Sequence, residues 1–292
     1  MTSDPRPTFD LQSHSQHSDG ALTPREVVAT AVAAGVELLA LSDHDTAAGV
    51  PEAAEAASAA GIGLVPATEI STMFNGASDL HVLGYLIDPA DPALTAALAR
   101  SRADREARAQ AMAGALRELG FLLDDAALAQ RTARGQSVGR PHLAQAVISR
   151  SENRLRLEAE GLTDPTSFLV AYLIEGRPAF RPRSAPEVAE AIELIHGAGG
   201  LAVWAHPFWD IDAPAEVLDA IDRFRHAGLD GVESFYPSHT EPQTRLLADR
   251  CAELGMLSTG SSDFHGPRHK TFSAFRAFHL YGRRPVLGPL AG

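Results

Sequence analysis

Short apolar runs recur along this chain, and most of them end in a histidine or a carboxylate. The first, FDLQSHSQHSDG (9–20), changes within a few residues from apolar side chains to His14, His17 and Asp19. Similar polar ends close later runs at SDHD (42–45), ATE (67–69), AHP (205–207) and SSDFH (261–265). A strand that ends in imidazole and carboxylate groups is a common way to hold a metal ion. We therefore expect these segments, with His81, to converge on one site.

Helical patterns separate the apolar runs. The segment 22–35 has Thr23 as N-cap, Pro24 at the first helical position and Glu26 at the third, which together predict a helix start. Further helices are expected at 51–61, 186–200, 213–228 and 240–255. The expected strands are the opening run and 37–45, 62–71, 79–87, 201–208, 231–237 and 256–265, with a turn at FNGAS (74–78). Seven strands alternating with helices indicate an α/β fold with a parallel sheet.

Between residues 91 and 182 the alternation stops and the chain becomes helical and more charged. One long helix is expected at 93–120, with shorter ones near 124–133, 141–150 and 165–175. We interpret 91–182 as a helical insertion between two parts of one domain, 8–90 and 183–285, followed by closing coil from 270 onward. The Arg run in the long helix (Arg100, Arg102, Arg105, Arg108) is most simply a solvated face.

Composition limits the possible partners. The 292 residues are 45% hydrophobic and carry a net charge of −12, which disfavours a groove for long duplex nucleic acid. No apolar run is long enough to cross a membrane. The start, MTSDPRPT, lacks the pattern of a signal peptide, and the one cysteine, Cys251, fits a reducing compartment. We therefore expect a cytoplasmic protein.

The polar residues favour one end of each strand. Sites in parallel α/β barrels are built at the carboxyl ends of the strands, and His81 is the exception because it comes early in its strand. Four other histidines, at helix ends or in the tail, are interpreted as structural: His196, His226, His269 and His279. His17 is either a turn residue or a substrate contact. The polar strand ends are His14, His44, Glu69, Glu233, Asp263 and His265, with His206 directly after its strand.

These motifs resemble those of the PHP (polymerase and histidinol phosphatase) superfamily of metal-dependent phosphoesterases. The resemblance is closest to its branch of small nucleotide phosphatases and 5′–3′ exoribonucleases. Within the insertion, GRPHLA (139–144) and YLIEGRPAF (172–180) look like phosphate-contacting segments of that branch. The other matching segments are DLQSHSQHSDG (10–20), SDHDT (42–46), ATEIS (67–71) with HVLGY (81–85), AHP (205–207) and SSDFHG (261–266).

The resemblance implies a distorted (β/α)7 barrel with a helical insertion, in agreement with the seven strands counted above. It also implies a site for two or three divalent ions, for which we expect manganese first, with iron or zinc as alternatives. Glu69 would be the carboxylate that bridges two ions. The implied metal ligands are His14, Asp19, His44, Glu69, His81, His206, Asp263 and His265.

One position departs from the family pattern. The first motif usually reads His-x-His, but here Gln12 replaces the first histidine. An amide oxygen is a neutral and weaker ligand than imidazole. We therefore treat Gln12 as a candidate weak ligand and expect the ion nearest to it to bind less tightly than its neighbours.

The implied activity is that of a hydrolase. Divalent ions would activate a hydroxide and clamp the phosphoryl oxygens for in-line attack. The expected substrates are small nucleotides, either a nucleoside 3′,5′-bisphosphate or AMP, and also short 5′-phosphorylated oligonucleotides. Alternatives are a metabolite phosphatase of the histidinol-phosphate type and a non-catalytic metal-binding regulatory module. Glu69, His206 and His265 are the candidate catalytic residues, and Arg140, Arg177 and His239 the candidate substrate contacts.

Overall fold

The computed structural model describes residues 7–74, 78–133, 136, 138–182 and 185–292. The chain divides into two compact units, one formed by Met1–Ala99 and Ala185–Gly292 and the other by Arg100–Ser184. Two expectations concern residues that are largely outside the described ones. They are the turn at FNGAS, of which residues 75–77 are not described, and the interpretation of the start of the chain, of which residues 1–6 are not described.

The first unit is built on one sheet whose seven strands follow the order of the chain. The sheet almost closes into a barrel, because the Leu11 amide donates to the carbonyl of Gly260 at 3.1 Å and Ser13 pairs in parallel with Phe264. The predicted seven-stranded distorted barrel is therefore confirmed. The strands are β1 (Phe9–Asp10), β2 (Leu38–Leu41), β3 (Gly63–Phe74), β4 (Ser78–Tyr85), β5 (Leu201–Trp204), β6 (Gly231–Phe235) and β7 (Leu257–Gly260).

The prediction of a parallel sheet is wrong at β4. This strand pairs antiparallel with β3, where Ala67 faces Tyr85, and antiparallel with β5, where Val82 faces Trp204. The few residues between β3 and β4 are far too few for the crossover that a parallel pair needs. The beginning of β4 therefore lies at the edge where the parallel strands end, and this explains why His81 comes early in its strand.

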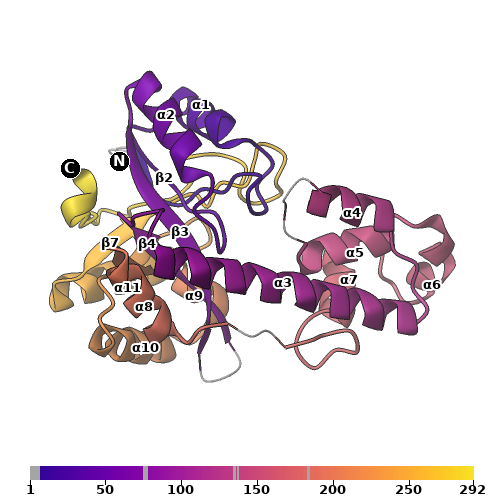
Figure 1. Ribbon diagram of the computed structural model, residues 1–292. Helices are drawn as coiled ribbons and strands as arrows, with labels where there is room; N and C mark the ends of the chain where they lie inside the picture. The colour runs from indigo at the N-terminus through magenta and orange to yellow at the C-terminus, as the bar shows by residue number, and fades with distance from the viewer. Residues whose placement is uncertain (1–6, 75–77, 134–135, 137, 183–184) are drawn as a thin grey trace. The chain divides into compact units, whose positions relative to one another are not determined.

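Helices of the first unit cover the outside of the barrel (Figure 1). The capping box between Thr23 and Glu26 starts the first helix as predicted, and Gly61 ends the second with a φ of 73°, which suits glycine. The one-turn helix α9 (Pro207–Asp210) was not predicted. The longer helices are α1 (Pro24–Ala33), α2 (Val50–Ala60), α8 (Val188–Gly197), α10 (Pro214–His226) and α11 (Glu241–Leu254).

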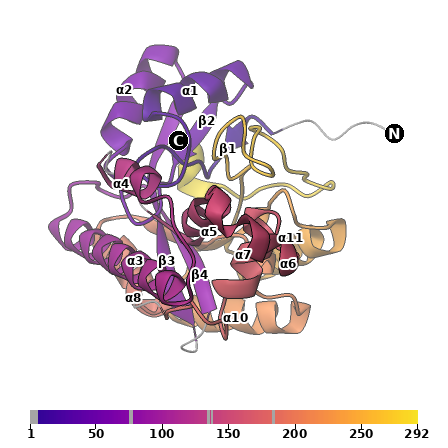
Figure 2. The ribbon, with the colours of Figure 1, turned by 90° about the vertical axis from the view of Figure 1, so that its right-hand side faces the viewer.

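The C-terminal segment is largely irregular, as expected, apart from the 3₁₀ turn η2 (Gly288–Ala291), but it is well packed. The ring of Phe275 stacks on Phe264 at 4.2 Å, and Phe278 packs on Phe9 at 5.6 Å. Figure 2 shows this segment in yellow beside β1. The Arg276 guanidinium donates to the carbonyls of Pro7, Ala34 and Gly35, which ties the end of the chain to its beginning.

The second unit is helical. The predicted helices are α3 (Pro92–Glu118), which begins in the first unit, α4 (Asp125–Ala133), α5 (Arg140–Ile148) and α7 (Pro165–Tyr172). The turn η1 (Ser151–Asn153) and α6 (Arg154–Ala159) were missed because they are short and charged. Buried Asn153 joins them to the core, since its amide donates to the carbonyls of Leu122 and Val147.

The Arg run on α3 is only partly a solvated face. Arg100 and Arg102 are exposed, but Arg108 is half-buried, donates to the carbonyl of Arg181 at 2.8 Å and lies over the ring of Phe180. In the part of the chain that the structure describes, no helix combines the length with the apolar composition that a membrane span requires.

We predict that Arg276→Met lowers the free energy of unfolding by about 1–3 kcal/mol, because three carbonyl groups lose their charged donor. Urea denaturation measures this loss. The matched control is Arg245→Met, which removes an exposed pair with Glu241 on α11 and should cost less than about 1 kcal/mol. Equal losses in the two variants would show that Arg276 does not anchor the tail.

Candidate metal centre

The first motif forms a tight loop whose conformation is fixed by hydrogen bonds to Asp43. The buried Asp43 carboxylate accepts hydrogen bonds from the Ser15 amide at 2.7 Å, the Ser15 hydroxyl at 2.7 Å and the Ser18 hydroxyl at 2.6 Å. The loop closes so tightly that a Cβ at Gly20 would collide with the carbonyl group of His14. These contacts fix the position of His14 and Asp19. Sequence reasoning missed Asp43, although the repeated serines of the first motif were a usable signal.

Three residues at this edge of the barrel have left-handed backbone conformations that are unfavourable for non-glycine residues. They are Asp45 with a φ of 52°, His206 with 31° and Asp263 with 54°. Such strain persists only where the surrounding structure enforces it, and it concentrates at functional sites. Asp45 is held by Ser71, whose amide donates to its carboxylate at 3.0 Å.

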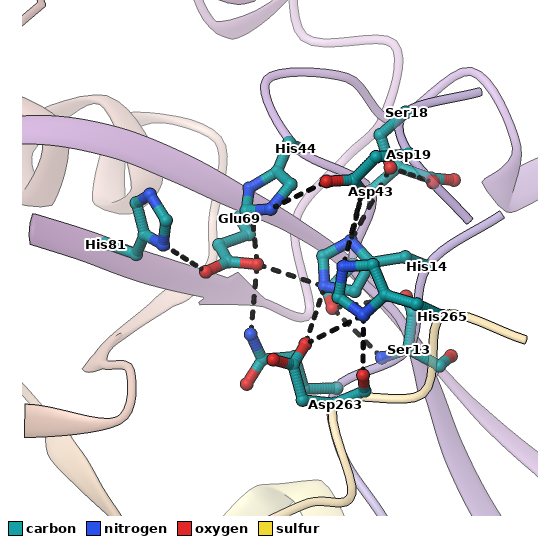
Figure 3. Close-up of polar contacts among 12 residues, drawn as sticks. Ser13, His14, Ser18, Asp19, Asp43, His44, Glu69, His81, Asp263 and His265 are labelled. Carbon is teal, nitrogen blue, oxygen red and sulfur yellow. Dashed lines mark hydrogen bonds and ion pairs between the residues drawn. The ribbon is translucent and has the colours of Figure 1, made fainter. Parts of the chain in front are cut away.

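Glu69 lies at the centre of the site and is completely buried (Figure 3). Its Oε2 is 3.1 Å from Nε2 of His14 and 3.4 Å from Nδ1 of His44. Its Oε1 is 2.8 Å from Nδ1 of His81 and 3.2 Å from Nε2 of His206. Four imidazoles from four segments of the chain thus surround one carboxylate, two on each oxygen.

Potential ligand atoms form three overlapping groups, within each of which the atoms lie no more than 4.8 Å apart. Glu69 is shared by two of them, as a bridging carboxylate would be. His206 belongs to none of the three but contacts Glu69 and lies 3.4 Å from Nδ1 of His81. The structure therefore brings all eight predicted ligands together. The groups are His14, Asp19, His44 and His265; His44, Glu69 and His81; and His14, Glu69 and Asp263.

The donor atoms in these groups fit divalent cations. Nε2 of His14, Nδ1 of His44, Oδ1 of Asp19 and Oδ1 of Asp263 are buried and make no well-aligned hydrogen bond among the described residues, although Nε2 of His14 lies 3.0 Å from Oδ1 of Asp263. Nδ1 of His265 donates to the carbonyl of Asp263 at 2.6 Å, which leaves the lone pair of Nε2 facing Asp19. Buried polar atoms without partners are costly, and a cation among them would remove that cost.

Burial and close packing shift the pKa values of the site. Burial lowers the pKa of His44 to about 3, so its ring is neutral, which is the form that binds metals. Burial opposes protonation of His14 as well, but the carboxylates of Asp263 and Glu69 outweigh it and raise the pKa of His14 well above its usual value. Burial alone would raise the pKa of Glu69, yet the four imidazoles around it together hold it well below its ordinary range. A cation binding here would displace protons from imidazole, so binding tightens as the pH rises.

A second layer of buried groups supports the ligands. Glu233, noted in the sequence only as a polar strand end, accepts hydrogen bonds from the His206 amide at 2.9 Å and from the Ser261 hydroxyl. Burial raises the pKa of Glu233 to about 8. The Tyr236 hydroxyl donates to Asp263 at 2.7 Å. The sequence held no specific signal for Tyr236, because this contact joins two strand ends.

Gln12 takes part in the site through hydrogen bonds. It is completely buried, its amide nitrogen donates to Oε2 of Glu69 at 2.9 Å, and its amide oxygen faces the Ser261 hydroxyl at 3.3 Å. The amide thus sits against the same carboxylate oxygen as His14 and His44. Its expected role as a weak ligand stays a prediction.

The remaining candidate residues are members of none of the three ligand groups. His239 is buried, donates from Nδ1 to the carbonyl of Ser234 at 3.2 Å, and burial lowers its pKa to about 4. Half-buried His17 joins none of the groups, and its role stays open. Arg140, at the start of α5, and exposed Arg177 belong to the helical unit. Their roles as substrate contacts stay predictions.

Two of the histidines interpreted as structural have local partners. His196 pairs with Asp230 at 2.8 Å, and Nδ1 of His226 donates to the carbonyl of Asp222 at 2.6 Å. His226 thus caps a carbonyl at the end of α10, whereas His196 ties the end of α8 to the segment before β6. Neither contacts the groups around Glu69.

Comparison with known proteins agrees with this geometry. The PHP domain model matches residues 10–127. The chain is 34% identical to a 5′-3′ exoribonuclease of Haemophilus influenzae, over 89% of this chain and 90% of that protein. It belongs to the PHP family. A 3′,5′-nucleoside bisphosphate phosphatase of Chromobacterium violaceum is 33% identical to this PHP protein, over 89% of this chain and 87% of the relative.

A solved structure extends the similarity to three dimensions. A protein of Bifidobacterium adolescentis, described as a metal-dependent phosphoesterase, superposes on this PHP protein with a TM-score of 0.76 and 30% identity, covering 91% of each chain. The chain is accordingly a hydrolase, a metal-dependent phosphoesterase. The alternative of a non-catalytic module finds no support among these relatives.

We predict that Gln12→His tightens binding of the weakest divalent ion by at least about tenfold, because an imidazole replaces a neutral amide beside Oε2 of Glu69. Isothermal titration of metal-stripped protein with Mn²⁺ measures affinity and stoichiometry. Gln110→His, on an exposed position of α3, is the matched control and should leave both unchanged. Identical binding in the wild type and Gln12→His would contradict this role for Gln12.

Proposed function

We propose that this PHP protein hydrolyses phosphomonoesters of small nucleotides, with a nucleoside 3′,5′-bisphosphate or AMP as substrate. Short 5′-phosphorylated oligonucleotides are proposed as further substrates. The observation that carries the proposal is the set of overlapping ligand groups that share Glu69. Two of the relatives that match most of the chain act, by their names, on RNA and on nucleoside bisphosphates, and this supports a nucleotide as substrate.

We propose that the groups around Glu69 hold two or three divalent ions, manganese first and iron or zinc as alternatives. Mixed imidazole and carboxylate donors suit these metals. When bound, such ions lower the pKa of water and neutralise charge on the phosphoryl oxygens. His14, Glu69 and Asp263 would form the buried side of the cluster, and Asp19, His44 and His265 its more accessible side.

The protein's own residues have distinct tasks in this proposal. Glu69 holds the imidazoles in place as an anion. His206 is a candidate to pass a proton to the leaving oxygen. Burial alone would lower the pKa of His206, but Glu69 outweighs this effect and the pKa rises to about 9. Its Nδ1 lies 3.8 Å from the carboxylate of Asp210. His265 is the other candidate, but only with an Nε2 free of metal, because its Nδ1 already donates to the carbonyl of Asp263.

The insertion, residues 91–182, is proposed as a lid or substrate-binding subdomain. Arg140 and Arg177 would bind phosphate oxygens, since a guanidinium matches phosphate geometry. In the first unit, His239 is proposed to contact substrate through Nε2, which is buried without a hydrogen-bond partner among the described residues. Substitution of each of these three residues should raise KM more than it lowers kcat.

The proposal predicts metal-dependent phosphate release with a preference for nucleotides. EDTA-treated protein should be inactive, and Mn²⁺ should restore activity on adenosine 3′,5′-bisphosphate or AMP. Phosphate release is measured for these two compounds, a short 5′-phosphorylated RNA and histidinol phosphate in parallel, with Mn²⁺, Fe²⁺ or Zn²⁺ added. Activity on histidinol phosphate alone would contradict the nucleotide substrate.

In the same assay His44→Ala should lower kcat/KM by at least about 100-fold, because it removes a donor from two ligand groups. The matched control, His279→Ala, changes an exposed histidine of the tail and should have no effect. Full activity in His44→Ala would show that the cluster around Glu69 is not the reaction centre.

A further inference from the structure

An exposed tryptophan lies beside the candidate metal centre. Trp209, in the short helix α9, is 54% exposed, and among the large apolar side chains exposed in the described part of the chain it is the only aromatic one. Its amide donates to the carbonyl of His206 at 2.8 Å, and the two rings lie 6.5 Å apart at 69°. The backbone strain at His206 and the turn of α9 together place Trp209 next to a predicted ligand.

Trp209 continues into a row of rings along the edge of the site. It lies 5.7 Å from Phe272 and 6.4 Å from Tyr236, whose hydroxyl donates to Asp263. Phe272 is 5.7 Å from His265 and stacks on His269 at 5.3 Å with an interplanar angle of 14°. The row therefore consists of Trp209, Tyr236, Phe272 and His269. It lies beside two candidate ligands, His206 next to Trp209 and His265 next to Phe272.

The two middle rings of the row are buried and its two end rings are exposed to solvent. Phe272 and Tyr236 are buried, whereas Trp209 and His269 are exposed. The amides of Thr271 and Phe272 donate to Nδ1 of His269. His269 therefore has a structural role, as predicted, because it fixes the backbone of residues 269–272. Exposed Arg268 and Lys270 flank His269 in the sequence. Aromatic rings together with basic residues are typical of surfaces that bind single-stranded nucleic acid.

We infer that Trp209 is the stacking surface for the nucleobase of the substrate. The inference rests on the proposed function, because it assumes that the phosphate ester is a nucleotide. Only the sugar separates a base from its phosphates, so a base on Trp209 leaves a phosphate free to reach the neighbouring ligand groups. Every base has a π-face, so stacking binds nucleotides without selecting among bases.

The first test compares two bisphosphates that differ only in the base. Phosphate release is measured from adenosine 3′,5′-bisphosphate and from its abasic analogue, 1-deoxyribose 3,5-bisphosphate, with the Mn²⁺-loaded enzyme. The wild type should favour the nucleotide in kcat/KM by about tenfold, mainly through KM. Trp209→Leu keeps an apolar side chain but no ring, and its preference should fall to about one. Trp209→Phe keeps a ring and should retain most of the preference.

The second test measures binding without turnover. Trp209 and buried Trp204 are the two tryptophans of the chain. With metal-stripped protein, AMP should quench the fluorescence of the wild type saturably, ribose 5-phosphate should not, and the quenching by AMP should vanish in Trp209→Phe, where only Trp204 remains. Quenching that persists in Trp209→Phe, or no quenching by AMP, would overturn the inference.

The outcomes separate the two proposals. Equal hydrolysis of the nucleotide and its abasic analogue by the wild type, or an unchanged preference in Trp209→Leu, overturns the stacking role and leaves the phosphatase activity standing. No phosphate release from either compound or from AMP contradicts the proposed function. The fluorescence titration then decides whether Trp209 binds a base.

Discussion

The structure depends on one buried anion. Glu69 is inaccessible to water, and an uncompensated carboxylate in such a position would be very unfavourable. Compensation comes from His14 and His44 on one oxygen and from His81 and His206 on the other. These groups are far apart in the sequence, so the barrel has to bring their strand ends together around Glu69.

Several features of the fold serve this convergence. Asp43 holds the first loop through its serines, and Glu233 holds the backbone of His206. The antiparallel β4 delivers His81 from the beginning of its strand rather than from the end. These contacts also explain why strained backbone is tolerated at His206, because the buried hydrogen bonds around it leave little freedom to relax.

Much of this arrangement could be predicted from the sequence, since apolar runs with polar ends show both the strands and the edge where the site lies. The number of strands and the convergence of their polar ends follow from that pattern, whereas the barrel and the set of eight candidate ligands were implied by the resemblance to the PHP superfamily. The direction of β4 does not follow from the pattern, because periodicity shows a strand but not its partner. Asp43 and Tyr236 were missed because each supports the site through hydrogen bonds to a segment that is distant in the sequence. Arg276 was missed because it binds carbonyl groups, which are present in every residue.

The most direct test of the central role of Glu69 is anomalous X-ray diffraction from crystals of the protein loaded with Mn²⁺. The account predicts manganese peaks on both sides of Glu69, one bonded to the oxygen beside His81 and one to the oxygen beside His14. Manganese peaks that lie elsewhere, with no ion bonded to Glu69, would contradict it.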